Sequence, residues 1–310
     1  MKAKITQKTS SLIMLVAKLL VIVIVAVMLY FKLEEQEDLI GQMTTLVSKA
    51  MNSSKHLFIV VILLMPINWL LETLKWKLLS GKLQPITMLQ ALNGVLTGIT
   101  LGFITPHAVG DYFGRILSSG NDNRLRLVGA IMLGRISQMI ATGVFGLFGI
   151  YYLLGAKPML LALLIATLLM LLFIFLFKNK WLIRLTKKYL SIIAEYSVNQ
   201  LILLQSLSMA RYLVFCFQFL LILKAFLPTL DHILASAGVT WIFLAKSLLP
   251  SFNFLSDLGI REYSAIYFFE QYHVEILPVV CASLFIWVIN ILVPTLVGLP
   301  LVLQLKWNRK

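Results

Sequence analysis

Long apolar runs, separated by short polar segments, dominate the hydrophobic pattern of the chain. Each run is about as long as the ~20 residues that an α-helix needs to cross a bilayer. The pattern therefore predicts an all-α, polytopic integral membrane protein. The runs cover residues 12–31, 57–74, 86–105, 127–153, 158–177, 206–227, 233–250 and 276–303.

Composition agrees with this pattern. Of the 310 residues 60% are hydrophobic and 13% are charged, whereas soluble domains carry roughly 25% charged residues. The longest polar connector runs only from Lys32 to His56. We therefore expect a single transmembrane domain over 1–310, in which residues 1–56 form a first span and an external loop. The first run lacks a small-residue cleavage site, so we interpret it as an uncleaved span rather than a signal peptide.

Two of the runs end at a proline that is followed by glycine, a carboxylate and an arginine. Broken backbone at membrane depth persists only where it is buried in protein or lines a wet cavity, and charge there is costly. In transporters such breaks mark the binding site. The first break comprises Pro106, Gly110, Asp111 and Arg115, and the second comprises Pro250, Gly259, Arg261 and Glu262.

The lysines and arginines of the loops indicate how these two runs are placed. If all eight runs crossed fully, the loop cations, with Lys75 among those on the cytoplasmic side, would divide evenly between the two sides, against the positive-inside rule. If the runs before Pro106 and Pro250 enter and return on the same side, most cations become cytoplasmic. We therefore predict six full spans and two re-entrant hairpins, with both termini cytoplasmic. Hairpins entering from opposite faces also indicate an inverted repeat with halves 57–177 and 206–303.

Charged residues at the predicted breaks and inside the runs are candidates for binding. Asp111 and Arg115 are four residues apart, so they share a helix face and can pair. Arg135 lies inside the fourth run, and Lys246 precedes Pro250. Once pairs are drawn, cations outnumber the nearby carboxylates, so we expect an anion between them. The candidate substrate-binding residues are Asp111, Arg115, Arg135, Lys246, Arg261 and Glu262.

A phosphate is the anion that this residue set suits best. A planar guanidinium binds phosphate through paired hydrogen bonds, and helix N-termini after the two breaks would add backbone donors. Phospholipid head groups are the most available anions inside a membrane. Arg211 and Lys224 lie near the ends of the run 206–227, so we expect them to extend to the interfaces.

The sequence contains none of the motifs that would indicate a cofactor, a metal or hydrolytic chemistry. It has no Gly-x4-Gly-Lys-Ser/Thr, no His-Glu-x-x-His and no Gly-x-Ser-x-Gly, and its four histidines are dispersed. We therefore predict no cofactor, and a transporter rather than an enzyme. The net charge of +14 is typical of cytoplasmic loops in membrane proteins, so we expect no binding of nucleic acid.

Regularly spaced glycines occur in two of the runs. Gly94, Gly98 and Gly102 fall on one helix face, and Gly143, Gly146 and Gly149 are spaced similarly in the fourth run. Small residues at such spacing let the backbone of another helix approach closely. We interpret both sets as packing positions.

Three stretches resemble the transmembrane region of lysylphosphatidylglycerol synthases and their stand-alone, flippase-like relatives. They are Leu74-Lys75-Trp76-Lys77-Leu78-Leu79, the segment from Phe103 to Arg115, and the segment from Ser247 to Glu262. The chain departs from the family pattern at the first break, with Ala108 for an arginine, Asp111 for a glutamate and Arg115 one residue later. In the fourth run Gly134 and Gln138 stand where the family often has acids.

This resemblance implies a multi-pass inner-membrane protein that moves an anionic or aminoacylated phospholipid between leaflets. It does not imply synthesis of that lipid, since the aminoacyl-transferring domain is missing from the sequence. A separately encoded lipid-modifying enzyme is then a possible partner. Three alternatives stay open: a secondary transporter of a small soluble anion, a membrane-embedded lipid transferase that would use Asp257 or Glu262, and a non-catalytic partner for a separately encoded synthase. The sequence does not indicate the oligomeric state.

Overall fold

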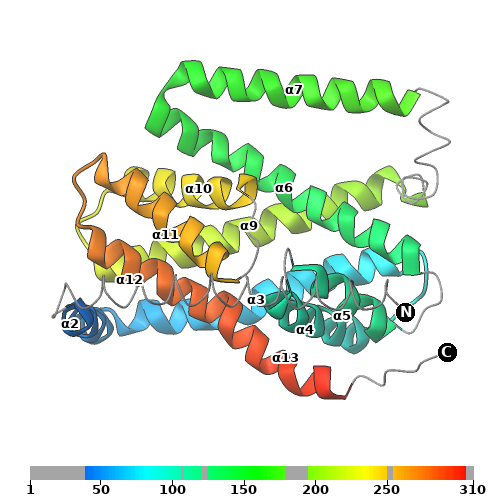
Figure 1. Cartoon of the computed structure of the whole chain (residues 1–310), viewed down its shortest axis with the longest axis horizontal. Coiled ribbons are helices and arrows are strands. Elements are labelled where there is room, and N and C mark those ends of the chain that lie inside the picture. The colour runs from blue at the N-terminus through cyan, green and yellow to red at the C-terminus, as the bar shows by residue number, and fades with distance from the viewer. Residues whose placement is uncertain (1–38, 106–107, 120–123, 179–194, 250–253, 305–310) are drawn as a thin grey trace, which may run out of the picture. The chain divides into compact units, whose positions relative to one another are not determined.

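The computed structural model describes residues 39–105, 108–119, 124–178, 195–249 and 254–304, and these residues form helices and short connections without a strand. The chain divides into two compact units, Met1–Lys49 and Ala50–Lys310. The helix α2 (Leu39–Ser53) carries the chain from the first unit into the second. The predicted first span, 12–31, lies outside the described residues. The other helices of the described residues, which Figure 1 shows, lie within the residue range of the second unit.

Four helical stretches of the described residues are long and apolar enough to span a membrane. They match the predicted spans at 57–74, 127–153, 206–227 and 276–303, and therefore confirm a polytopic, all-α protein. The stretches are α3 (Lys55–Ser80), α6 (Arg124–Leu154), α9 (Val198–Phe226) and the run of α12 (Ile276–Trp287), the π-helical turn η3 (Val288–Leu292) and α13 (Val293–Leu303).

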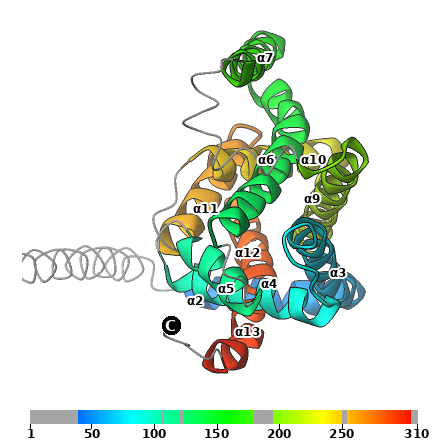
Figure 2. The ribbon, with the colours of Figure 1, turned by 90° about the vertical axis from the view of Figure 1, so that its right-hand side faces the viewer.

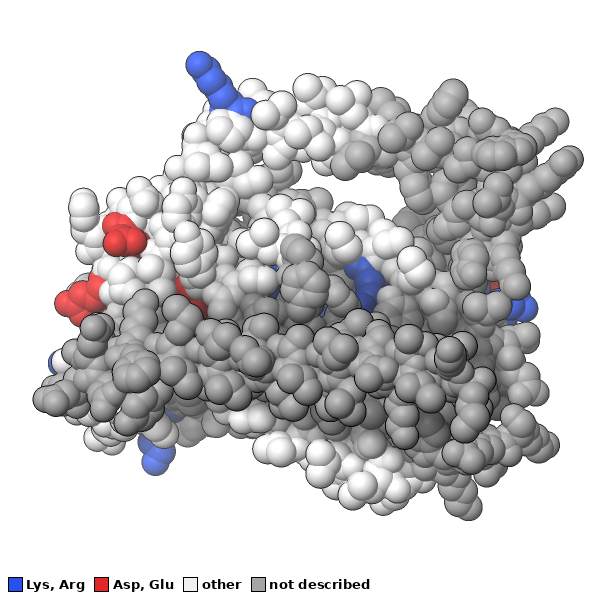
Figure 3. All heavy atoms as spheres, viewed as in Figure 1, with Lys and Arg blue, Asp and Glu red and all other residues white. Residues whose placement is uncertain are grey.

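The outer faces of these helices are apolar. Ile62 and Leu63 of α3 and Ile140 and Val144 of α6 are each about half exposed or more, as lipid-facing side chains are. The helix α7 (Ala156–Lys178) packs against α6 and lies at the edge of the unit in Figures 1 and 2. Figure 3 shows one face on which most of the described atoms belong to uncharged residues. Large exposed apolar surface of this kind is expected of a protein embedded in a membrane.

Two pairs of shorter helices stand where the sequence predicts the hairpins. The first pair is α4 (Met88–Ile104) and α5 (Val109–Ser119), and the second is α10 (His232–Leu248) and α11 (Phe254–Glu270). Within each pair the helices pack against each other. Pro106 and Pro250 lie between the members of a pair and outside the described residues. Their depth in a membrane, and hence the re-entrant topology, remains a prediction.

Glycines allow α4 and α5 to pack with their backbones in close contact. A Cβ atom added to Gly98 would lie 2.4 Å from Asp111 Oδ1, and one added to Gly114 would lie 2.5 Å from the backbone nitrogen of Gly98. A Cβ on Gly149 would lie 2.6 Å from the backbone nitrogen of Trp241, which brings α6 against α10. The predicted packing role is wrong for Gly143, since an added Cβ there meets nothing within 4 Å.

We expect Gly114→Ala to destabilise the protein by about 1–3 kcal/mol, because the atoms in the way of the new methyl group are backbone and cannot rotate aside. Gly143→Ala is the matched control. It adds the same methyl group to open space inside a helix, where alanine is favoured over glycine by up to about 1 kcal/mol. Thermal unfolding of the purified protein in detergent checks the pair. Equal midpoints for both variants would contradict the close contact of α4 and α5.

The N-terminus of α10 is capped by Asp231, which lies outside the membrane-spanning stretches. The carboxylate accepts hydrogen bonds from the backbone nitrogens of Leu234, at 2.8 Å, and Ile233, at 2.9 Å. These bonds favour the charged form and lower the pKa of Asp231 below its ordinary value. The cap therefore stabilises the fold above the unfolded pKa of about 4, and this contribution is lost as the pH falls through the lower, folded pKa.

We accordingly expect Asp231→Asn to remove the loss of folding stability that protonation of Asp231 causes at low pH. The cap itself should remain, because an asparagine side chain also accepts hydrogen bonds from these nitrogens. Asp231→Ala should lower the midpoint of thermal unfolding at every pH. Unfolding curves between neutral pH and pH 3 measure both variants. A steeper loss of stability in Asp231→Asn than in the unmodified protein on acidification would contradict the assignment.

Candidate functional site

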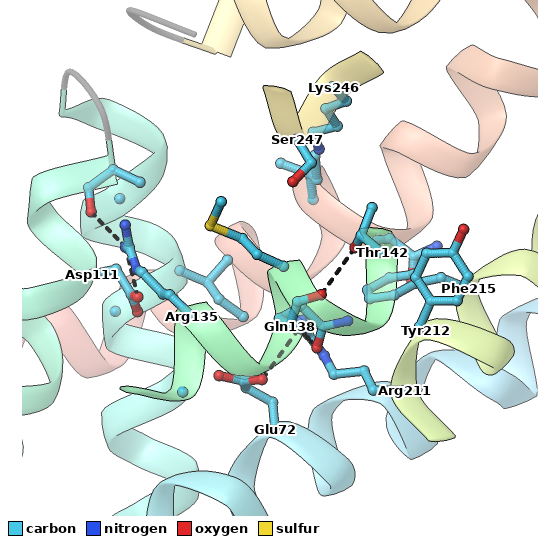
Figure 4. Close-up of a pocket in the computed structure, with 18 of the residues that line it drawn as sticks. Glu72, Asp111, Arg135, Gln138, Thr142, Arg211, Tyr212, Phe215, Lys246 and Ser247 are labelled. Atoms are coloured by element: carbon cyan, nitrogen blue, oxygen red, sulfur yellow. Dashed lines mark hydrogen bonds and ion pairs between the residues drawn. The ribbon is translucent and has the colours of Figure 1, made fainter. Parts of the chain in front are cut away.

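A cavity of about 580 Å³ lies among the helices of the second unit. It is lined from several helices at once, so residues distant in sequence face a common space (Figure 4). Its charged and polar lining includes Glu72 and Lys75 of α3, Asp111 and Arg115 of α5, Arg135 and Gln138 of α6, Arg211 of α9, Lys246 of α10 and Arg261 of α11.

A continuous chain of ion pairs crosses the wall of this cavity. Arg211 Nη1 lies 3.2 Å from Glu72 Oε2, and Arg115 Nη2 lies 2.9 Å from Glu72 Oε1. Arg115 continues the chain through its Nε, 2.7 Å from Asp111 Oδ1. Arg135 Nη2 completes it, 3.0 Å from Asp111 Oδ2 and 3.2 Å from the carbonyl oxygen of Ala108. Five charged side chains from four helices therefore form one network.

Lys75 and Gln138 extend the network on the side of α3. Lys75 Nζ lies 3.2 Å from Glu72 Oε2 and donates to Gln138 Oε1, also at 3.2 Å. Gln138 in turn donates to the carbonyl oxygen of Ser208, which ties α6 to α9. The side chain of Lys75 is only 2% exposed. Such a cation needs a partner when it is buried, and Glu72 supplies it.

Exposure differs along the chain of ion pairs. The side chain of Arg115, in the middle, is 9% exposed, whereas Arg211 is 21% and Arg135 is 37% exposed at the two ends. Arg115 is held between two carboxylates and holds the network together. The guanidinium groups at the ends each contact one carboxylate, so their remaining N–H donors are the ones available to a ligand.

Aromatic rings support these cations and form the apolar part of the cavity. The guanidinium carbon of Arg115 lies 5.6 Å from the ring centroid of Trp76. The guanidinium carbon of Arg135 lies 4.4 Å from the centroid of Tyr112, and that of Arg211 lies 4.9 Å from the centroid of Phe215. These distances are typical of cation–π contacts. Of these three rings Phe215 lines the cavity, and so do Phe103, Tyr212, Phe243 and Trp287. The cavity therefore combines a basic wall with apolar rings, which suits an amphipathic ligand.

The family model of the lysylphosphatidylglycerol synthase TM region matches residues 14–298. The chain belongs to this family. The match confirms the resemblance carried by the motifs, and it covers nearly the whole sequence, including every residue that lines the cavity. No curated protein and no solved structure gives a significant match. The family is one of membrane proteins related to lipid handling.

Most of the predicted binding residues of this family member line the same cavity. Asp111, Arg115, Arg135 and Lys246 do so, and Asp111 and Arg115 pair across one helical turn as expected. Arg261 also lines the cavity, with its side chain 3% exposed and its Nη2 2.9 Å from Glu262 Oε1.

Glu262 is absent from the cavity lining among the described residues, and instead accepts a hydrogen bond from Ser283 of α12 at 2.9 Å. Its contacts tie α11 to α12. The predicted structural breaks at Pro106 and Pro250 and the side chain of Asp257 lie outside the described residues. Gly110 packs tightly, because an added Cβ would lie 2.1 Å from the carbonyl oxygen of Leu101, whereas a Cβ added to Gly259 would meet no atom of the described residues within 4 Å.

Two predictions about cations are wrong. Arg211 does not extend to an interface: it lies in the middle of α9 and pairs with Glu72. Lys75, assigned to a cytoplasmic loop in the count of basic residues, is buried inside α3. The sequence analysis also missed Glu72. Its position inside an apolar run could have indicated a functional or paired residue, because a carboxylate at membrane depth is energetically costly.

Backbone geometry at the start of α5 brings further groups to the site. Ala108 has φ of 50°, in the left-handed region that few residues other than glycine adopt, and its carbonyl oxygen accepts from Arg135. The backbone nitrogen of Gly110 donates to Thr105 Oγ1 at 2.6 Å. This hydrogen bond occupies one of the backbone N–H donors that we predicted would bind a phosphate.

Proposed function

We propose that this protein is a lipid flippase or lipid-binding transporter that moves a phospholipid with a phosphate in its head group between membrane leaflets. The observation that carries the proposal is the cavity with its basic, ion-paired wall and its aromatic lining. Membership of a family related to lipid handling supports it. The acyl chains would stay in the surrounding lipid while the head group passes through the cavity.

In this mechanism the phosphate contacts the ends of the ion-pair network. Arg135 and Arg211 are the more exposed arginines of the network, and Arg211 Nε has no hydrogen-bond partner among the described residues. A guanidinium binds phosphate in a fixed, two-point geometry. Lys246 and Ser247 belong to α10 and line the same space (Figure 4). A head group held between α6, α9 and α10 could leave the water at one leaflet while its charge stays shielded from the hydrocarbon of the bilayer.

Leaflet exchange in reconstituted vesicles tests the proposal. The purified chain is placed in phosphatidylcholine vesicles that contain a trace of fluorescent phosphatidylglycerol, and a membrane-impermeant reductant bleaches the label in the outer leaflet. We expect bleaching to proceed beyond the outer-leaflet half only in vesicles that contain the protein. Bleaching that stops at half, with correctly folded protein present, would refute the proposal.

The same vesicles separate this function from transport of a small soluble anion. Vesicles loaded with buffer are exposed to radiolabelled inorganic phosphate, with and without a pH or sodium gradient. Lipid transport predicts no uptake above that of protein-free vesicles. Gradient-dependent uptake of phosphate without lipid exchange would favour the small-anion transporter instead.

A further inference from the structure

The charges in the cavity do not balance. The network of ion pairs contains two carboxylates, Glu72 and Asp111, and four cations, Lys75, Arg115, Arg135 and Arg211. The three arginines outnumber the two carboxylates even without Lys75. Lys246 adds another basic side chain to the lining. Within the described residues, the cavity is therefore net positive.

Each carboxylate oxygen of this network already faces a cation, although Glu72 Oε2 does so through ion pairs alone and has no hydrogen-bond partner among the described residues. Both oxygens of Glu72 already contact cations, Oε1 at 2.9 Å from Arg115 and Oε2 at 3.2 Å from both Lys75 and Arg211. Both oxygens of Asp111 do so as well, at 2.7 Å from Arg115 and 3.0 Å from Arg135. An ammonium group brought into the cavity would have to displace one of these contacts.

The other groups of the cavity do not change this balance. Gln138 Oε1, a neutral acceptor, is occupied by Lys75. Only Oε1 of Glu262 is bound to Arg261 and Ser283, and Oε2 is buried without a hydrogen-bond partner among the described residues. Glu262 is not, however, among the described residues that line the cavity. Of the rings that line the cavity and could attract a cationic ligand, Phe215 already lies against the guanidinium group of Arg211. The others pack in pairs, Phe103 against Trp287 and Tyr212 against Phe243.

From this geometry we infer that the cavity selects a head group whose net charge is negative and excludes one that carries an aminoacyl group with its ammonium charge. The inference rests on the proposed function and narrows its substrate class to unmodified, anionic phospholipids. A phosphate supplies the negative charge that the network lacks. A lysyl ester of the head group adds ammonium groups whose positive charge exceeds the negative charge of the phosphodiester. These ammonium groups would face the cations of the cavity wall at short range, where electrostatic repulsion is strong.

The test compares three labelled lipids in the phosphatidylcholine vesicles described above: phosphatidylglycerol, its lysyl ester and phosphatidate. We expect phosphatidylglycerol and phosphatidate to exchange, and the lysyl ester to exchange at least about tenfold more slowly, which corresponds to about 1.4 kcal/mol of discrimination. Equal rates, or faster exchange of the lysyl ester, would overturn the inference and leave the proposed function intact. Exchange of none of the three lipids would refute the proposed function itself.

A single substitution tests whether the charge of the cavity causes this selection. In Gln138→Glu the new carboxylate would lie beside Lys75 and Arg211, whose nitrogens are now 3.2 and 3.5 Å from Gln138 Oε1. We expect the preference for phosphatidylglycerol over its lysyl ester to narrow by about tenfold. Gln90→Glu is the control, since Gln90 is exposed at the start of α4 and outside the cavity lining. An unchanged preference in folded Gln138→Glu would contradict an electrostatic origin.

Competition with inorganic phosphate tests whether the ligand of the cavity is a phospholipid or a soluble phosphate ion. Inorganic phosphate present on both sides of the vesicle is expected to leave the exchange of phosphatidylglycerol unchanged at millimolar concentration, because the ligand of the cavity is delivered by the membrane. Inhibition at that concentration, together with phosphate uptake, would assign the cavity to the soluble ion and overturn the lipid assignment.

Discussion

Glu72→Gln is expected to destabilise the protein by about 3–5 kcal/mol, the typical effect of removing one partner from a buried ionic group. Glu72 contacts three cations, Lys75, Arg115 and Arg211. Glutamine matches the size of glutamate but not its charge, so the substitution leaves these cations facing one another. The expected result is a large drop in the thermal midpoint, measured by intrinsic tryptophan fluorescence in detergent, or a failure to yield monodisperse protein.

Glu270→Gln is the matched control for this substitution. Glu270 lies at the exposed C-terminal end of α11, where loss of a surface charge changes stability by about 0.5 kcal/mol or less. A second variant keeps the prediction testable if Glu72→Gln does not fold. The double substitution Glu72→Gln/Arg211→Gln removes one of the unpaired cations with the carboxylate, so it should regain part of the lost stability. A Glu72→Gln variant as stable as Glu270→Gln would show that the network does not hold α3, α5 and α9 together.

The fold was largely predictable because its main signals are local. An apolar run of membrane length specifies a helix with little help from tertiary contacts, and four of the predicted spans correspond to α3, α6, α9 and the stretch Ile276–Leu303. A proline after an apolar run ends a helix for a local reason. The helices α4 and α10 accordingly end at Ile104 and Leu248, two residues before Pro106 and Pro250.

The site was predictable only in part, because the end of an apolar run is not the end of a helix. The run 206–227 places Arg211 near its beginning, yet α9 starts at Val198 and has 29 residues, so Arg211 lies near its middle. Similarly α3 continues from the run 57–74 to Ser80, which carries Lys75 into the interior. Polar residues that pair with one another extend a helix beyond its hydrophobic stretch, and hydropathy alone does not register them.

Partners across helices were the second part that the sequence could not supply. The spacing of Asp111 and Arg115 predicts their contact, because both lie on one helix. Nothing local links Glu72 to Arg115 or Arg211, which lie on α5 and α9. These contacts depend on the tight α4–α5 packing at Gly98 and Gly114 and on the approach of α9 to α3. Such contacts between helices decide which cations are structural and which remain available.

Arg135→Gln is expected to slow leaflet exchange of phosphatidylglycerol by about 10- to 100-fold and to leave the fold intact. A charge-assisted hydrogen bond contributes about 1.5–3 kcal/mol, which sets the size of the effect. Arg135 stands at the end of the ion-pair network with 37% of its side chain exposed. Its loss does not strand Asp111, whose other oxygen stays 2.7 Å from Arg115. Exchange is measured in the reconstituted vesicles, and the thermal midpoint in detergent reports the fold.

Arg126→Gln is the matched control on the same helix. Arg126 is also an arginine of α6, its side chain is 42% exposed, and it pairs with Glu195 rather than with a residue that lines the cavity. Both substitutions remove one positive charge from one ion pair of similar exposure, so they differ mainly in whether the guanidinium faces the cavity. We expect Arg126→Gln to retain exchange at nearly the rate of the unmodified protein. Equal losses in the two variants would trace the effect to net charge or helix stability, and would remove Arg135 from the binding site.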